Sequence, residues 1–239
     1  IDEDNPSIQI SSYVYNNYYV STDGGGNFSY IGNASGGWFI NPTDYDSESN
    51  ILYAANEYNN LFRVIEVGTN NTKGSVNVDL SGGKISAITV DPMTANRIWV
   101  SSYGNSTGNL GIVRIDNAHT SNPTTSFLPI TSTVSANAYV SNIALEAGNS
   151  NHIVVTLSNF GLNSIWESTD GGINWSSIEG DLPDMPVRWA IFHPDNADKL
   201  YIATELGVWV TTNINGSSTT WSPANNSSLP NTRVDMLQY

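Results

Sequence analysis

The sequence predicts an all-β fold made of repeated four-stranded units, and three observations support this prediction. Short runs rich in Val, Ile, Tyr and Trp alternate with clusters of Gly, Asn, Asp, Ser and Pro along all 239 residues. No long stretch keeps the 3.6-residue period of an amphipathic helix. Related segments recur about every 45–50 residues, the size of one four-stranded propeller blade. We therefore expect a β-propeller.

The repeated unit is clearest in residues 187–213 and 85–104. Each segment reads as a strand, then His-Pro or Asp-Pro, a polar turn and a second strand. Residues 38–58 repeat the scheme around Asn41-Pro42, and residues 140–161 repeat it without the proline. Proline fits this position because the first strand ends there and needs no further ladder N–H. The last unit shows all four expected strands, named A to D in chain order, at 187–192, 199–204, 207–212 and 219–224.

The whole chain is expected to form a single propeller or propeller segment of about five blades. The expected blades are 1–35, 36–81, 82–132, 133–184 and 185–231, with 232–239 as an extra innermost strand. The first unit lacks strand A, because 4–12 matches 195–204. Either residues 232–239 pair with the first blade and close a five-bladed ring, or the chain is part of a larger propeller. We favour the larger propeller, because five-bladed rings are the less common solution and Ile1 opens in the middle of the pattern.

Composition excludes several classes of function. Asp and Glu outnumber Lys and Arg by 22 to 8, giving a net charge of −14. This balance argues against nucleic-acid binding, which needs clustered basic residues. The absence of cysteine removes disulfides, thiolate zinc sites and cysteine nucleophiles. No apolar run approaches the roughly 20 residues of a membrane span, so we expect no membrane insertion.

Two Gly-rich turns, 21–28 and 168–175, share the pattern Ser-x-Asp-x-Gly followed by an aromatic residue. Asp23 and Asp170 are 147 residues apart, which is three units of 49. Glycine supplies positive φ in tight turns, and Asp accepts hydrogen bonds from turn N–H groups. We interpret both turns as architectural, with cation binding as the less favoured alternative. The residues assigned this structural role are Ser21, Asp23, Gly25, Phe28, Ser168, Asp170, Gly172 and Trp175.

The turn pattern resembles the Asp-box, or bacterial neuraminidase repeat, of sialidases, xyloglucan-cleaving endoglucanases and sortilin-type receptors. Residues 211–221 resemble a decayed copy that lacks the carboxylate. Residues 182–221 and 229–239 are also similar to large surface proteins of Bacteroidota, which often end in a type IX secretion sorting domain. The resemblance implies an extracellular or cell-surface bacterial protein, with the remainder of a longer polypeptide as one partner.

The face of the disc that carries the B–C and D–A loops is the expected functional face, because propeller sites usually lie there around the central opening. Four B–C loops carry an aromatic residue beside Asn or Gly: Tyr15, Tyr58, Tyr103 and Phe160. Such residues suit binding of a polysaccharide, by stacking and hydrogen bonding, or contact with another surface protein. The alternative is that the aromatic residues only cap strand ends.

Two arginines and one glutamate complete the candidate ligand-binding residues. Arg188 and Arg233 each head an expected strand A, and Glu205 lies in a B–C loop. One interpretation has both arginines facing the channel mouth to hold an anionic group. The other pairs Arg188 with Asp181 or Asp184.

The sequence identifies no catalytic residue, metal ligand or cofactor site. The Arg-Ile-Pro signature of sialidases is absent, and the candidate acids of a glycoside hydrolase are not paired by any motif: Glu57, Glu205, Asp181 and Asp184. Residues 44–48 alternate carboxylates as calcium ligands do, but a solvated A–B turn is favoured there. His119, His152 and His193 are far apart, and His193 is interpreted as a turn residue.

The sequence thus favours a non-catalytic binding or structural propeller module. A glycoside hydrolase fragment, xyloglucanase-like or sialidase-like and with an incomplete catalytic set, is the alternative.

Overall fold

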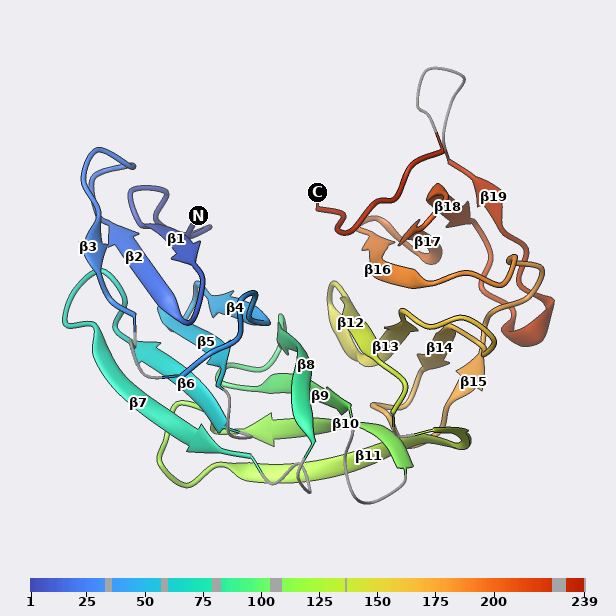
Figure 1. Cartoon of the computed structure of the whole chain (residues 1–239), viewed down its shortest axis with the longest axis horizontal. Helices are drawn as coiled ribbons and strands as arrows, with labels where there is room; N and C mark the ends of the chain where they lie inside the picture. The colour runs from blue at the N-terminus through green and yellow to red at the C-terminus, as the bar shows by residue number, and fades with distance from the viewer. Residues whose placement is uncertain are drawn as a thin grey trace.

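The computed structural model describes residues 1–32, 36–56, 60–78, 83–103, 109–135, 137–224 and 231–238. Within these ranges it contains 19 β-strands and one short 3-10 helix, Gly216–Ser218. The strands form five antiparallel sheets arranged as an open arc around a central opening (Figure 1). The predicted all-β propeller fold is confirmed, and its form is a partial propeller.

Each sheet is one blade, and its strands run in chain order from the central opening to the rim. Blade 1 has three strands: β1 (Gln9–Tyr13), β2 (Asn17–Ser21) and β3 (Ser29–Tyr30). Blade 2 has four: β4 (Thr43–Asp46), β5 (Ile51–Ala55), β6 (Asn60–Ile65) and β7 (Thr72–Asn77). Blade 3 also has four: β8 (Lys84–Val90), β9 (Ile98–Tyr103), β10 (Asn109–Asp116) and β11 (Thr124–Ser135).

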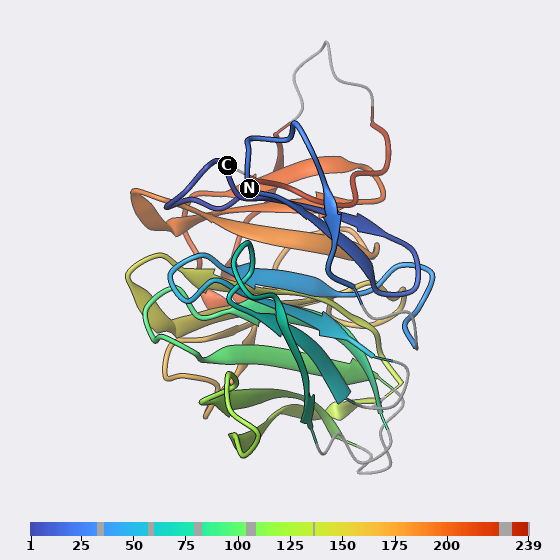
Figure 2. The same ribbon diagram turned by 90° about the vertical axis from the view of Figure 1, so that its left-hand side faces the viewer.

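The last two blades repeat this order. Blade 4 contains β12 (Val140–Glu146), β13 (Asn149–Leu157), β14 (Ile165–Ser168) and β15 (Ser176–Ser177). Blade 5 contains β16 (Val187–His193), β17 (Asn196–Thr204), β18 (Gly207–Thr211) and β19 (Ser222–Pro223). In the view of Figure 2, blades 1 to 3 lie one below another, with blades 4 and 5 behind them.

Apolar clusters between consecutive blades form the core. Strand β5 shows how the sequence produces this arrangement, because all five of its residues are buried. Tyr53 packs in the cluster shared with blade 3, whereas Leu52 packs in the cluster shared with blade 1. Successive side chains of a strand point to opposite faces. A continuous apolar run therefore fits a strand that has a neighbouring blade on each face.

Hydrogen bonds from side chains to backbone join the inner strands of neighbouring blades. Asp44 in β4 accepts the N–H of Val90 in β8 at 2.7 Å. Thr89 donates its hydroxyl to the carbonyl of Ile143 in β12 at 2.7 Å. Asn142 accepts the N–H of Ala190 in β16 at 3.1 Å. Each junction from blade 2 to blade 5 therefore has a polar link beside its apolar cluster.

Two expectations about strands need correction. The predicted strand before Pro42 is absent, and β4 begins after it at Thr43. The carboxylates at 44 and 46 therefore lie in the strand rather than in a solvated turn. The backbone N–H of Trp38 donates to the Asn41 side chain, and the backbone carbonyl of Trp38 accepts the N–H of Tyr15. Residues 38–40 consequently connect two blades instead of joining a ladder.

The described part of the C-terminal segment, 231–238, contains no strand. Its Val234 N–H donates to Thr204 at the end of β17. Strand β16 already occupies the inner edge of β17, so the segment has no free ladder there. From blade 5 the segment runs toward the central opening (Figure 1). Among the described residues, no ladder joins it to β1.

The described part of the chain holds no helix with the length and apolarity needed to cross a bilayer.

Candidate functional site

The loops separate onto two faces as the four-stranded units require. On one face, the C–D turns bond to the chain near the start of strand B: Gly24 N–H donates to Ser7, just before β1, and Gly171 N–H donates to Asn151, near the start of β13. On the other face, the B–C loops bond to the D–A connections. Tyr15 N–H donates to the Trp38 carbonyl, and Gly161 N–H to the Asp184 carboxylate.

The turns at 21–28 and 168–175 have the same hydrogen bonds. In the first, the Ser21 hydroxyl donates to Asp23 and accepts the N–H of Gly25. Asp23 also accepts the backbone and side-chain N–H groups of Asn27 at 2.9 and 2.8 Å. Hydrogen bonds to the Asn27 side chain, then to Ser21 and the Asn27 backbone, hold the pKa of Asp23 well below its usual range. The carboxylate therefore organises its own turn.

The second turn repeats this arrangement. Ser168 donates to Asp170 and accepts the N–H of Gly172, while Asp170 accepts the backbone and side-chain N–H groups of Asn174. The bonds from Asn174, first backbone and then side chain, and from Ser168 lower the pKa of Asp170 to about 2. Among the described residues, no three His, Asp or Glu side chains gather in a way that would hold a metal ion.

The aromatic residues of the two turns differ. Trp175 packs against the core cluster between blades 3 and 4 and donates its indole N–H to the Gly172 carbonyl. Phe28 is 46% exposed. The two aromatic residues occupy equivalent positions in the turns but therefore differ in burial.

At blade 1, the opposite face carries a cluster of exposed apolar side chains. Tyr15 and Phe39 are 51% and 66% exposed and meet edge to face, with ring centroids 6.1 Å apart. Tyr13 and Ile40 are exposed beside them, and Tyr13, Phe39 and Ile40 all line a hollow of about 250 Å³. Of these four residues the sequence indicates only Tyr15 as a candidate, because residues 38–40 are expected to form a strand before Pro42.

The other aromatic candidates lie further along the arc. Tyr103, at the end of β9, pairs with Tyr139 before β12 at a centroid distance of 5.0 Å. Phe160, in the β13–β14 loop, is 68% exposed. Tyr58 lies outside the described residues, as does Glu57. The tyrosine–tyrosine pair was missed because Tyr139 lies in a D–A connection rather than in a B–C loop.

The candidate arginines form a charge cluster with two carboxylates. Arg188 donates from Nε to Glu205 at 2.8 Å and lies 3.7 Å from Asp235. Arg233 pairs with the same Asp235 at 2.7 Å. Asp181 and Asp184, suggested earlier as partners of Arg188, instead accept the backbone N–H groups of Trp221 and Gly161. The cluster balances two positive charges with two negative ones and fastens the C-terminal segment to blade 5.

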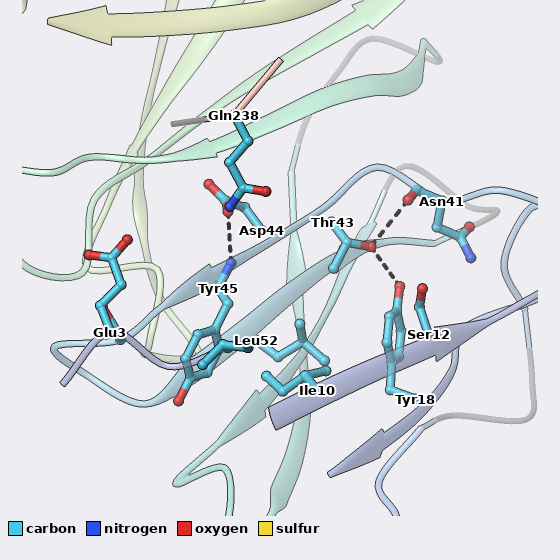
Figure 3. Close-up of a pocket in the computed structure, with 12 residues that line it drawn as sticks. Glu3, Ile10, Ser12, Tyr18, Asn41, Thr43, Asp44, Tyr45, Leu52 and Gln238 are labelled. Carbon is cyan, nitrogen blue, oxygen red and sulfur yellow. Dashed lines mark hydrogen bonds between the residues drawn. The ribbon is translucent and has the colours of Figure 1, made fainter. Parts of the chain in front are cut away.

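A second hollow, of about 370 Å³, lies between β1 and β4 (Figure 3). Tyr18 and Thr43 share a hydroxyl hydrogen bond of 2.7 Å, and Thr43 donates to the Asn41 carbonyl. Asp44 accepts the N–H groups of Tyr45 and Val90, yet burial raises its pKa to about 6. Gln238 of the C-terminal segment lines the same hollow.

Glu179 is a residue of the B–C/D–A face that the sequence did not reveal. It accepts the N–H of Ser164 at 2.7 Å. Burial raises its pKa to about 7, although backbone hydrogen bonds from Ser164 and Ile165 act in the opposite direction. No sequence motif surrounds Glu179. Only its place in the D–A connection, packed against the 158–164 loop, identifies it as a candidate residue.

His152 is held between two glutamates on the face of the C–D turns. Its ring nitrogens lie 2.9 Å from Glu146 and 2.9 Å from Glu167. Burial lowers the pKa of His152, but the hydrogen bonds to the two glutamates outweigh burial and raise it. His193 accepts the N–H of Asp195 at 3.2 Å.

Comparison with solved structures supports the propeller fold. A GH74 enzyme from Niastella koreensis matches 92% of this chain with a TM-score of 0.70 and 17% identity, over 37% of its own length. An ancestral GH74 enzyme matches 98% with a TM-score of 0.69 and 19% identity, over 31% of its length. YCF48 bound to D1 peptide matches 86% with a TM-score of 0.58 and 15% identity, over 61% of its length.

The chain thus spans about a third of the length of the GH74 enzymes that it resembles. No family model matches the sequence, and no curated protein matches it. These likenesses define the class of fold, a β-propeller.

Proposed function

We propose that this chain is a non-catalytic binding module of an extracellular or cell-surface bacterial protein. It contacts a polysaccharide or another surface protein through the B–C/D–A face, and the rest of a longer polypeptide adjoins it. The exposed aromatic residues of that face carry the proposal. Single exposed apolar residues need no explanation, but Tyr13, Tyr15, Phe39 and Ile40 form a continuous group.

The chemistry of this group favours a polysaccharide. The flat faces of Tyr15 and Phe39 offer stacking surfaces, and Ser12 and Asn41 line the adjoining hollow with hydrogen-bonding groups. A mostly apolar pocket with a few polar groups is the usual composition of a ligand site. The net charge of −14 favours a neutral or basic ligand over a polyanion.

Affinity for soluble polysaccharides, including xyloglucan, tests this proposal. We expect the Tyr15→Ala/Phe39→Ala double variant to lose at least about tenfold in affinity, because it removes both stacking faces. Phe28→Ala is the matched control, since it removes an exposed aromatic residue from the opposite face. Equal losses in both variants would contradict the proposal. Binding of surface proteins but of no glycan would assign the face to protein contact.

Glycoside hydrolysis is the second candidate, and Glu179 favours it. A carboxyl group with a pKa of about 7 has the protonation state that a general acid needs near neutral pH. The likeness to GH74 enzymes agrees with this chemistry but shows only the fold. Release of reducing sugar from xyloglucan by the chain, abolished in Glu179→Gln, would support the enzyme. Unchanged polymer length after prolonged incubation would favour the binding module.

A further inference from the structure

Buried polar atoms without a hydrogen-bond partner gather at the junction of blades 2 and 3. The residues described by the structure contain four such side-chain atoms, in Tyr53, Arg63, His119 and Trp209. Tyr53 of β5 and Arg63 of β6 are cross-strand partners. Nη1 of Arg63 donates to the two carbonyls that flank His119 in the β10–β11 turn of blade 3. Because an unpaired buried polar atom costs free energy, three at one junction need a physical explanation.

Arg63 carries a buried charge that no carboxylate balances. Only 7% of the residue is exposed. Within the described ranges Arg63 forms no ion pair, whereas the other four arginines of the chain each pair with an aspartate or glutamate. Its Nη1 bonds neutral carbonyls, and its Nε has no partner. Burial lowers the pKa of Arg63, as expected for a buried charge without a counter-ion.

The hydroxyl of Tyr53 supplies a second donor beside this charge. Tyr53 is fully buried, and its hydroxyl is unpartnered. Burial raises the pKa of Tyr53, Asp46 raises it further, and the Arg63 cation acts in the opposite direction. Hydroxyl and guanidinium are therefore close enough to interact, and the hydroxyl keeps its proton at neutral pH. The pair offers a neutral O–H and a charged Nε–H.

Gly74 of β7 leaves space next to the same guanidinium. It is the cross-strand partner of Arg63. A Cβ at this position would lie 3.1 Å from Nε and 3.4 Å from Nη2, and its three nearest atoms would all belong to Arg63. Its φ lies outside the left-handed region, so backbone geometry does not require glycine here. Glycine inside a strand often marks the close approach of a ligand or another group.

These donors and this space restrict the ligand to a small anion. An anion supplies the counter-charge that the buried guanidinium lacks, and it accepts hydrogen bonds from both donors. The room left by a single absent side chain suits a monatomic ion and excludes a phosphate or a sulfate. A water molecule would accept a hydrogen bond from Nε but would leave the buried charge uncompensated.

We propose that the junction of blades 2 and 3 binds a small monovalent anion of the size of chloride, held by Nε–H of Arg63 and the hydroxyl of Tyr53 and seated against Gly74. The ion neutralises the buried arginine and thereby stabilises the contact of β6 with the β10–β11 turn. This site goes beyond the proposed function, because it lies between two blades and involves none of the exposed aromatic residues of the B–C/D–A face.

Salt-dependent unfolding tests this proposal, with bromide as the probe. Sodium gluconate is replaced by sodium bromide at one total ionic strength, so that screening of the net charge of −14 stays constant. The unfolding equilibrium constant of the parent should fall by about tenfold for each tenfold rise in bromide above its dissociation constant. General effects of the salts on burial act on every variant alike, so the comparison between variants isolates the site.

Three substitutions and a matched control make the prediction specific. Gly74→Ala places a methyl group in the proposed seat, and Arg63→Met removes the charge, so both should abolish the bromide dependence. Tyr53→Phe should raise the dissociation constant for bromide by about two- to tenfold, because one neutral donor is lost. Ser75→Ala changes the next, exposed residue of β7 and should retain the full parental dependence. An equal bromide dependence in Gly74→Ala and Ser75→Ala would overturn the proposal.

Crystals provide a second readout that does not depend on how well any variant folds. Bromide scatters X-rays anomalously, so parent crystals soaked in sodium bromide should show an anomalous peak in contact with Nε of Arg63 and the hydroxyl of Tyr53. A water molecule alone at this position would overturn the proposal, as would equal stability of the parent in bromide and gluconate. Neither measurement involves glycan, so the outcome is independent of the proposed polysaccharide binding.

Discussion

Blades 1 and 4 carry the same turn but differ in what surrounds it. Both turns are built by a serine hydroxyl and an aspartate that bond only within the turn. In blade 4 the aromatic residue of the turn, Trp175, packs against the core cluster between blades 3 and 4, as Leu128 of blade 3 also does. In blade 1 no described strand lies on the corresponding side, and Phe28 is exposed. Local sequence therefore determines the turn, whereas the neighbouring blade determines burial.

The strands behind these turns show the same contrast. Ile153 of β13 pairs with Ser168, as Gln9 of β1 pairs with Ser21. Residues 152–157 of β13 are all buried, whereas no residue of β1 is. A blade without a covering strand thus keeps its hydrogen-bonded turn while losing much of its core.

The largest expected effect tests this contrast in the core. Ile153→Ala should lower the free energy of unfolding by about 2–5 kcal/mol, because the deleted atoms leave a cavity between blades 3 and 4. Ile10→Ala in β1 should cost less than about 1 kcal/mol, since its side chain is only partly buried. Urea denaturation measures both. Equal losses would mean that β1 is as well packed as β13.

The next largest effect is a pH dependence of stability that arises in blade 4 and not at the equivalent place in blade 1. In blade 4 the N–H of Ile178 donates to the Ile165 carbonyl, and Glu179 is the next residue. At the equivalent place in blade 1 the N–H of Ile31 donates to the Tyr18 carbonyl, and the next residue is Gly32. Blade 4 thus has a titrating group where blade 1 has none. The folded-state pKa of Glu179 is raised to about 7, so the unfolded chain loses this proton first. Stability should therefore fall as pH rises from about 4.5 to 7.

Glu179→Gln removes this proton linkage and should gain roughly 1–2 kcal/mol relative to the parent at pH 8. Near pH 4 the two proteins should be almost equally stable. Urea midpoints of the parent and of Glu179→Gln, measured across this pH range, give the difference in stability. Asp44 and His152 titrate in both proteins, so their contributions cancel in this difference. A constant difference from pH 4 to 8 would refute the assignment.

A smaller effect concerns the aromatic residues of the two turns. Trp175→Ala should destabilise the fold by roughly 1–2 kcal/mol, because Trp175 packs against the core cluster and bonds Gly172. Phe28→Ala should stay within about 0.5 kcal/mol of the parent. Thermal midpoints of the two variants provide the comparison. A larger loss for Phe28→Ala would place a covering group over blade 1.

The smallest effect should be shared by the two turns. Asp23→Ala and Asp170→Ala should each lower stability modestly and leave ligand binding intact, because both carboxylates bond only their own turns. Their folded pKa values are lowered, so their contribution is present above about pH 4 and is lost as pH falls below it. Acid titrations followed by tryptophan fluorescence measure this loss. Loss of ligand affinity in a folded variant would instead make the turns part of the binding site.

The four-stranded units and the two turns were predictable because short-range signals encode them. Strand alternation, glycines with positive φ and the Ser-x-Asp spacing all act within about ten residues. Gly24 and Gly171 both have φ of 74°, as tight turns at equivalent positions require.

The misplaced strand of blade 2 shows where such signals fail. Residues 38–40 are as apolar as a buried strand, but Phe39 and Ile40 are exposed in a connection between blades. Whether an apolar run is buried depends on a neighbouring blade, which the local pattern does not contain. Similarly, the partner of Arg188 is Glu205, 17 residues away on the next loop, and no spacing rule selected it over Asp181 or Asp184.

The polar links between inner strands bear on how such a chain could gain blades. Each link joins one side chain, from Asp44, Thr89 or Asn142, to a main-chain group of the next blade. Every duplicated blade brings main-chain groups with it, whatever its side chains are. A new junction therefore needs one suitable polar residue rather than a matched pair, which lowers the number of coordinated substitutions that follow a duplication.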